Sequence, residues 1–366
     1  MQYIKTLLKK LMDAPGLSGF ETPVADLIWH EWEDTCDEVT VSKVGSLHGL
    51  KKGAQPVGHK ARSVLIAAHM DAIGMMVTEH HGSFLRFTDV GGIDPRILPG
   101  TPVTVHCSGP GDVIQRPGVI ASPHPRAMAP TNGSIPMNEL LVDLGMGEAD
   151  LKSQVKIGDL ISFNTHPMEH GSDVISGHSA DNRASVTALS TFLRNNKNRQ
   201  FGWDVLAVAT SQEETNFAGA YTSSRSASPD LAIVIDVTFA KGPGSNDWKT
   251  YASGKGITLG LGPNIHTGFM RKVKSIAEEI EIPISVEPMP KHSGTDAYAV
   301  QVANAGIPTI VIGIPLKYMH TPVEMVNTTD IKRTAKLLEG ICSELDDKFL
   351  KKIAWDHEEN DGTAED

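Results

Sequence analysis

An apolar segment early in the chain ends in two side chains suited to metal chemistry. Residues 64–74 read VLIAAHMDAIG, which is typical of a buried strand, but this strand ends at His69 and Asp71. Other apolar runs are followed by side chains of the same types, which are Glu213, Glu214, Asp236 and His320. Asp181 adds a further carboxylate at the start of a helical pattern. Imidazole and carboxylate groups without thiolates suit zinc, cobalt or manganese, so the pattern predicts a metal site.

The apolar runs alternate with helical patterns over the second half of the chain. The predicted strands are WDVLAVAT, LAIVIDV and TIVIGIP, and the predicted helices lie around residues 186–193, 268–281, 297–306 and 330–353. This alternation indicates an α/β fold with a mostly parallel sheet flanked by helices. Because the carboxyl ends of parallel strands meet at one edge of a sheet, we expect the candidate ligands to converge there.

The segment from residue 73 to residue 168 has a different character. Nine of the 22 prolines lie between residues 91 and 136, among short apolar runs separated by turn residues. We expect an inserted, small all-β, barrel-like domain between the two parts of an α/β catalytic domain, residues 1–72 and 169–355. Residues 356–366 carry six carboxylates and no lysine or arginine, which predicts a disordered acidic tail.

Each candidate ligand also has an ordinary structural interpretation. A histidine at a strand end is commonly a hydrogen-bonded rim residue, Asp181 could be a helix N-cap, and paired glutamates after a strand are commonly a solvated turn. The convergence of independent strands favours a site instead. Burying several carboxylates together without cations would cost too much free energy.

The number of candidate ligands exceeds what one ion needs. A catalytic zinc ion with an open position takes about three protein ligands. Two imidazoles with three or four carboxylates suit two ions, about 3.5 to 4 Å apart, that share one carboxylate. We expect two divalent metal ions per subunit, with zinc as the first choice and cobalt or manganese as alternatives.

The chain carries, in this order, the motifs HMDAIG, SADNRAS, QEETNFAGA, IDV, SGTDA and YMHTPVEMV. This set resembles the tetrahedral-aminopeptidase or glutamyl-aminopeptidase family of dinuclear zinc metallopeptidases, over residues 3 to about 350. The resemblance implies a hydrolase that acts on short peptides as a metal-dependent aminopeptidase. It also implies that the insert is a dimerisation domain and that the protein is a homo-oligomer, built from dimers up to a tetrahedral dodecamer.

The resemblance assigns a role to each candidate residue. The implied metal ligands are His69 and Asp236 for one ion, Glu214 and His320 for the other, and Asp181 as the bridge. Asp71 would lie behind His69 and fix its tautomer. Glu213 would be the catalytic general base.

These assignments predict hydrolysis of the amino-terminal peptide bond by a water activated between two metals. A dinuclear deacylase acting on N-acyl amino acids or sugars is the alternative enzyme, because it would share the metals and the glutamate base. A catalytically silent scaffold is the alternative outside enzymes. Lost ligands would favour the scaffold, and none of the ligand positions is lost.

Some positions beside the ligands differ from the usual family pattern. Asn182 stands where aspartate is common, and His178 where lysine is common. We interpret His178 as an exposed side chain in preference to a surplus ligand or a substrate contact. Ser293 and Thr295 predict a cap for the helix that follows, and Asp296 suits its first turn; the resemblance places this turn beside the site.

Composition limits the partners and the compartment. Of the formal charge of −11, −6 comes from the acidic tail, and no basic stripe with aromatic residues is present, which excludes nucleic-acid binding. No apolar run approaches the roughly 20 residues that span a bilayer, and the first residues lack the apolar centre of a signal peptide. The three cysteines are far apart, which argues against a disulfide framework. We expect a cytoplasmic protein without a membrane partner.

Overall fold

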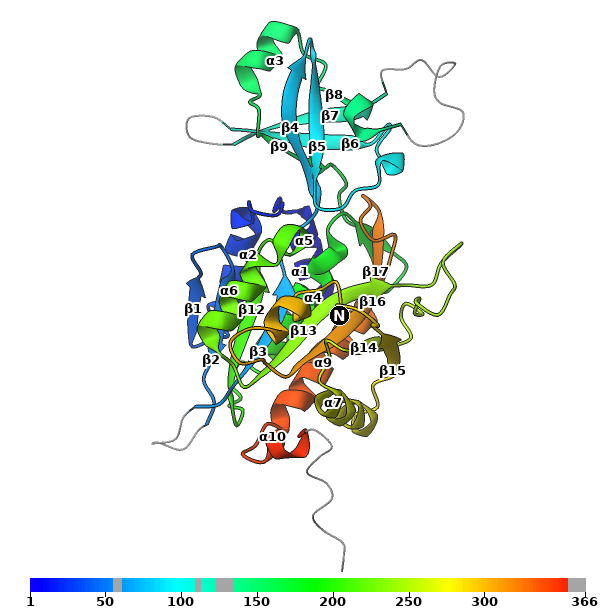
Figure 1. The fold of residues 1–366 in the computed structure, drawn as a ribbon. Helices are drawn as coiled ribbons and strands as arrows, with labels where there is room; N and C mark the ends of the chain where they lie inside the picture. The colour runs from blue at the N-terminus through cyan, green and yellow to red at the C-terminus, as the bar shows by residue number, and fades with distance from the viewer. Residues whose placement is uncertain (55–60, 109–112, 123–134, 355–366) are drawn as a thin grey trace, which may run out of the picture.

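The chain folds into two parts that Figure 1 shows one above the other. The computed structural model describes residues 1–54, 61–108, 113–122 and 135–354. The lower part is built on a large mixed sheet, and the upper part is a closed barrel. The predicted acidic tail, residues 356–366, lies outside the described residues. No helix within the described ranges is long and apolar enough to cross a membrane.

The large sheet contains eleven strands over the described residues. Nine form a row in the order β1 (Glu38–Val41), β2 (Leu47–Lys51), β12 (Asp204–Thr210), β3 (Ser63–His69), β13 (Leu231–Phe239), β16 (Thr309–Lys317), β17 (Glu324–Asn327), β11 (Val174–Gly177) and β10 (Met168–His170). Beside β16 lie β14 (Ile257–Leu261) and β15 (Ile284–Pro288). The central strands β12, β3, β13 and β16 are parallel, whereas both flanks of the row pair antiparallel. The predicted α/β fold class is therefore confirmed, with its parallel pairs at the centre.

The central strands are buried along nearly their whole length, as continuous apolar runs predict. The helices are α1 (Gln2–Asp13), α2 (Thr22–Trp32), α4 (Ala180–Asn195), α5 (Glu213–Asn216), α6 (Ala218–Ala227), α7 (Thr267–Glu279), α8 (Ala297–Gln301), α9 (Thr328–Ser343) and α10 (Phe349–Lys352). Helix α4 packs on β3 and β13 and contacts α1 and α9, while α6 and α8 pack together on β12 and β13 (Figure 1). Helices therefore flank the sheet, and its central strands are shielded from water.

Several helix boundaries differ from the sequence-based expectation. Helix α2 begins at Thr22, its cap position is Glu21, and no side chain caps it. The helix expected over residues 297–306 ends early, where the backbone turns left-handed at Asn304. The closing helix is two helices, because Trp203 Nε1 donates to the carbonyl oxygen of Asp346 at 3.1 Å and fixes a non-helical turn there.

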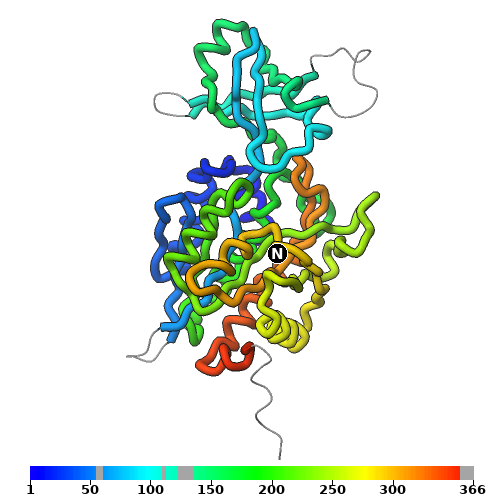
Figure 2. The backbone as a smooth tube through the Cα atoms, viewed as in Figure 1, coloured from blue at the N-terminus to red at the C-terminus, as the bar shows by residue number. Residues whose placement is uncertain are grey.

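The barrel closes through six strands in the order β4 (Gly74–His81), β5 (Phe84–Val90), β8 (Leu141–Asp143), β7 (Ile114–Ala121), β6 (Pro102–Cys107) and β9 (Leu160–Phe163). Helix α3 (Glu148–Gln154) and the 3-10 turns η1 (Pro95–Ile97) and η3 (Met137–Glu139) connect them. The barrel has a hydrophobic cluster of its own, separate from that of the large sheet. Its first strand pairs with its last, so the chain enters and leaves at neighbouring points, as the tube in Figure 2 shows. The insert that the sequence predicts is therefore a barrel.

Candidate metal centre

The carboxyl ends of the central strands bring the predicted ligands together at one edge of the sheet. Strand β3 ends at His69, and the parallel strand β13 carries Asp236 two residues beyond its last pair with β3. Glu213 and Glu214 open α5, directly after β12, and His320 follows β16. The sheet thus explains why residues far apart in sequence become neighbours.

Asp181 lies between the two histidines. Its Oδ1 is 3.3 Å from His69 Nε2, and its Oδ2 is 3.4 Å from His320 Nε2. The carboxylate is buried, and Oδ1 has no hydrogen-bond partner. The alternative interpretation of Asp181 as a helix cap is wrong, because Ser179 occupies the cap position of α4 and no side chain caps the helix. A carboxylate that faces one imidazole with each oxygen has the geometry of a bridging ligand.

Three groups of side chains in the described ranges could hold a metal ion, and within each group the ligand atoms lie within 4.8 Å of one another. The groups are His69, Asp181 and Asp236; Asp181, Glu214 and His320; and His69, Glu213 and Glu214. The first two share Asp181 and match the two ligand sets implied by the motifs. Asp236 Oδ1 and Glu213 Oε2 lie 3.7 and 3.8 Å from His69 Nε2.

The cluster is buried and strongly acidic. The side chains of Glu213 and Glu214 are only 9% and 6% exposed, so the interpretation of this pair as a solvated turn was wrong. Burial, together with the charge of Asp181, raises the pKa of Glu214 to about 8, and burial also raises the pKa of Asp236. Burial opposes a charge on His69, yet the surrounding carboxylates, Glu213 first, raise its pKa well above the ordinary value.

These side chains fit divalent cations. Within the described ranges no lysine or arginine forms an ion pair with Asp181, Glu213, Glu214 or Asp236, and the two imidazoles are the only partners of opposite charge. Several carboxylates buried without cations cost free energy that metal ions remove. The donor set of oxygen and imidazole nitrogen suits zinc, cobalt or manganese.

Asp71 supports the cluster from behind. Its Oδ1 accepts a hydrogen bond from the backbone N–H of Glu213 at 3.0 Å, and its Oδ2 accepts one from Glu214 at 3.1 Å. The Asp71 carboxylate is 3.5 Å from His69 Nδ1, and its carbonyl oxygen is nearer, at 3.2 Å. With a proton on Nδ1, His69 presents the lone pair of Nε2 to the cluster. Asp71 therefore positions three of the residues around it.

Glu324 performs the same task for the other side of the cluster, and the sequence analysis assigned it no role. Its Oε2 accepts from the backbone N–H of Asp181 at 3.1 Å, and its Oε1 accepts from that of His320 at 2.9 Å. The side chain is 1% exposed. The signal that could have found it is a glutamate between two apolar residues of the motif YMHTPVEMV, four residues after the histidine.

His178 is a buried residue, so its interpretation as an exposed side chain was wrong. It is 7% exposed, its ring contacts that of Phe163 edge-on at 5.0 Å between centroids, and Nδ1 has no hydrogen-bond partner. Burial lowers the pKa of His178 to about 3. It belongs to none of the three metal-binding groups of the described residues.

The turn before α8 borders the cluster, as the resemblance implied. Thr295 Oγ1 accepts from the backbone N–H of Ala297 at 3.3 Å, but the cap position of α8 is Asp296 and no side chain caps the helix, so the prediction of Ser293 and Thr295 as the cap was wrong. Asp296 is fully buried and accepts from the Thr210 hydroxyl. Burial raises the pKa of Asp296 to about 7. This carboxylate therefore belongs to the electrostatic surroundings of the cluster.

Three non-glycine residues near the candidate metal ligands adopt left-handed backbone conformations. Their φ angles are 65° at Ser179, 59° at Gln212 and 60° at His320. Such conformations cost free energy and persist where surrounding contacts enforce them, often at functional sites. The hydrogen bonds that the Asp71 and Glu324 carboxylates accept from nearby backbone N–H groups provide such contacts on either side.

The cluster opens into a pocket of about 290 Å³. Phe239, Met289 and Met319 line it with apolar surface, and the loop from Ser293 to Thr295 forms part of the rim. The pocket thus combines an acidic cluster that could hold metal ions with apolar walls, which suits an organic substrate larger than water.

Comparison with known proteins identifies the family. The sequence profile described as M42 glutamyl aminopeptidase matches residues 45–337. The chain belongs to this family. A lysyl aminopeptidase of Pyrococcus furiosus is 31% identical over 346 residues, which cover 93% of this chain and 96% of the relative. The family resemblance inferred from the motifs is therefore confirmed, and the comparisons support an aminopeptidase, which is a hydrolase.

Solved structures of similar proteins share the fold. An aminopeptidase from the archaeon Desulfurococcus kamchatkensis has a TM-score of 0.88 at 30% identity, covering 97% of this chain and 98% of that chain. A TET peptidase of Pyrococcus horikoshii, described as assembling into a tetrahedron or a large octahedral shell, has a TM-score of 0.81 at 29% identity, covering 93% of this chain and all of that chain. The similarity spans both the large sheet and the barrel.

Proposed function

We propose that this protein is a two-metal aminopeptidase that removes residues from the amino terminus of short peptides. The observation that carries the proposal is the position of Asp181, whose two oxygens face His69 and His320 at 3.3 and 3.4 Å. His69 and Asp236 would hold one ion, Glu214 and His320 the other, and Asp181 both. Zinc is the first choice, with cobalt and manganese as alternatives of similar donor preference.

Two bound divalent ions would supply Lewis acidity, which makes a water molecule more acidic and stabilises negative charge on the substrate's carbonyl oxygen. Glu213 would be the base. Its carboxylate faces the pocket, while its backbone N–H is held by Asp71. As the water oxygen bonds to the carbonyl carbon, Glu213 accepts the water's proton, and it donates that proton to the nitrogen as the C–N bond breaks.

The acidic floor also accounts for a preference for free amino termini. A substrate's α-ammonium group carries a positive charge that the carboxylates around Asp236 would stabilise. An N-acyl group removes that charge and adds bulk at the same place. An aminopeptidase and a deacylase with similar metals should therefore differ in whether they prefer substrates with a free or an acylated amino group.

The test is a panel of aminoacyl chromophores, each with and without an N-acyl block, on chelated enzyme titrated with zinc, cobalt or manganese. Turnover of unblocked substrates alone, and only after metal is restored, is the expected result. Equal turnover of blocked substrates would replace the proposal by the deacylase. Two bound metals without any turnover would replace it by a silent scaffold.

The relatives also suggest an assembly. We propose that residues 73–168 form a dimerisation domain and that dimers build a larger homo-oligomer; the TET peptidase of Pyrococcus horikoshii is described as assembling into a tetrahedron or a large octahedral shell. Sedimentation of the intact chain should give the mass of an even number of subunits, with twelve as the expected number. A monomer at micromolar concentration would contradict this assembly.

A further inference from the structure

Glu287 shares the pocket of the metal centre, although none of the motifs contains it. It lies on β15, three strands away from Asp236 across the sheet, and both side chains line the same pocket. Among the other residues lining this pocket, Phe239 and Met289 are apolar. The pocket therefore has a second carboxylate region that is separate from the metal cluster.

Two threonine hydroxyls hold the Glu287 carboxylate in place. Thr238 donates to Oε1 and Thr258 donates to Oε2, each at 2.7 Å. Gly313 leaves room for this arrangement, because a Cβ there would lie 2.2 Å from Thr258 Oγ1 and 3.1 Å from Glu287 Oε2. The carboxylate is thus fixed at one position and not free to rotate away.

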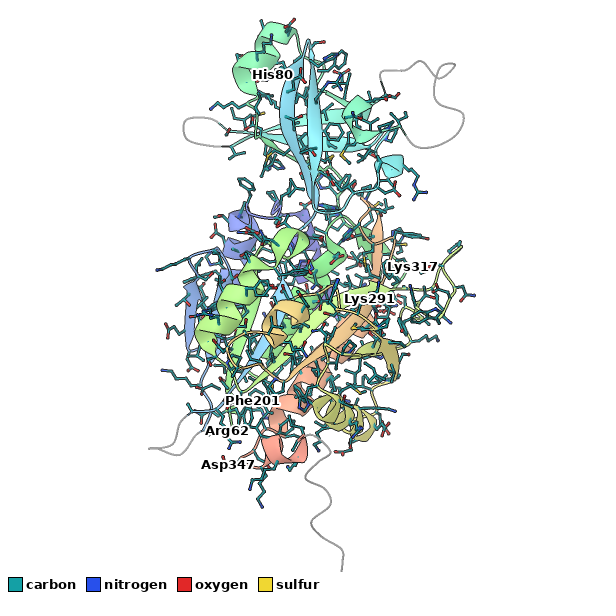
Figure 3. All side chains as sticks on the ribbon, viewed as in Figure 1. Arg62, His80, Phe201, Lys291, Lys317 and Asp347 are labelled. Carbon is teal, nitrogen blue, oxygen red and sulfur yellow. The ribbon has the colours of Figure 1, made fainter. Side chains whose placement is uncertain are left out.

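Glu287 lacks a cation within the described ranges. No lysine, arginine or histidine described there forms an ion pair with it, and its hydrogen bonds come from neutral hydroxyls. Lys291, which Figure 3 labels over the middle of the lower part, is exposed and makes no ion pair with it. A partly buried carboxylate without a counter-charge is costly, and it favours a positively charged group arriving from the pocket.

The separation between Glu287 and the metal ligands suits a long side chain. Asp236 and Thr238 lie on the same face of β13, two residues and therefore about 6.8 Å apart along the strand. Glu287 Oε1 is 2.7 Å from Thr238 Oγ1, and all three residues line the same pocket, so a side chain that extends along β13 from Asp236 toward Thr238 approaches Glu287. The extended side chain of lysine reaches about 6 Å from Cα to Nζ, counting five single bonds.

We propose that Glu287 determines specificity by binding the cationic side chain of an amino-terminal lysine or arginine. The apolar walls at Phe239 and Met289 would contact the aliphatic stem, and the carboxylate would accept hydrogen bonds from the ammonium or guanidinium group. This inference rests on the proposed aminopeptidase function and adds the substrate class.

The test compares lysyl, arginyl, norleucyl and glutamyl chromophores on the metal-loaded wild type, E287Q and E278Q. Norleucine has the stem of lysine without its charge, and Glu278 is an exposed glutamate outside the pocket, so E278Q is the matched control. In the wild type, kcat/KM for lysine and arginine should exceed that for norleucine by about 10- to 100-fold, the range of a charge-assisted hydrogen bond. E287Q should lose this ratio while it keeps norleucine turnover, and E278Q should keep both.

Calorimetric binding of free L-lysine and L-norleucine gives a readout that does not require turnover. The wild type should bind L-lysine more tightly, and E287Q should bind the two alike. A wild type that prefers glutamate, or an E287Q variant that loses all substrates equally, would overturn the inference. The wild-type ratio decides the question even where E287Q does not fold. Absence of turnover for every unblocked substrate would overturn the aminopeptidase proposal itself, whereas turnover without a lysine preference overturns only this inference.

Discussion

The carboxylates of the metal centre fall into two sets, which differ in the groups that form their hydrogen bonds and ion pairs. Asp71 and Glu324 lie behind the cluster, and each accepts two hydrogen bonds from backbone N–H groups. Asp181 and Glu214 lie in front, where they face imidazoles, and Asp181 Oδ1 has no hydrogen-bond partner. Backbone N–H groups of the fold satisfy the carboxylates behind the cluster, whereas the carboxylates in front require cations to balance their negative charge.

The two sets of carboxylates also differ in role: those behind the cluster position other residues, whereas those in front are the candidates for metal chemistry. The carboxylates behind the cluster tie down the backbone of Asp181, Glu213, Glu214 and His320, the four residues that reach forward from turns. His69 and Asp236 instead lie on strands β3 and β13, and Asp71 contacts His69 through the imidazole ring and not through its backbone N–H. Buried carboxylates therefore hold the backbone of the site residues outside the strands, whereas the sheet positions the candidate ligands that lie on strands.

The largest effect should come from the front region. Glu213→Gln removes the base but keeps the shape of the side chain, so kcat should fall by about 10²- to 10⁴-fold. Metal analysis should still find two ions per chain, because Glu213 is outside both implied ligand sets. Steady-state kinetics with the same metal loading measures the change. An active variant that retains its metals would remove Glu213 from this role.

A smaller effect should come from the region behind. Glu324→Gln replaces one acceptor oxygen by an NH₂ group that faces the N–H of Asp181 or His320. Metal affinity should fall by about 10- to 100-fold, as for other residues that orient ligands, and stability by about 1 to 3 kcal/mol. Competition with a chelator measures the affinity, and E278Q serves as control. Unchanged metal affinity would show that the backbone at Asp181 and His320 keeps its position without the hydrogen bonds to Glu324.

The smallest expected effect is the dependence of the metal-free protein's free energy of unfolding on pH. The pKa of Glu214 is raised to about 8 and that of His320 to about 9, so the folded state binds more protons than the unfolded state from about pH 6 to 9. The free energy of unfolding should therefore fall as pH rises through this window. Asp71, whose pKa is lowered, keeps its contribution throughout it. Urea unfolding of chelated and metal-loaded protein at several pH values should show the steeper decline without metal.

The sequence predicted the site residues whose positions follow from the order of the parallel strands. His69 and Asp236 end up together because parallel strands share an edge, and the apolar runs before them identified those strands. Glu324 and Glu287 escaped prediction because they lie on strands outside the parallel centre: β17 pairs antiparallel with β16, and β15 reaches β16 only through β14, an order that local sequence does not encode. His178 was misjudged for a similar reason: the barrel residue Phe163 covers it, and that contact joins two parts of the fold.

The most direct test of the two-metal centre counts the metal ions in Asp181→Ala and Asp236→Ala. Elemental analysis under native conditions should find two ions per chain in the wild type. Asp181→Ala should lose both together, because its oxygens face both histidines at 3.3 and 3.4 Å, and Asp236→Ala should lose one. One ion retained at full occupancy in Asp181→Ala would contradict a shared carboxylate and with it the two-metal centre proposed for this chain.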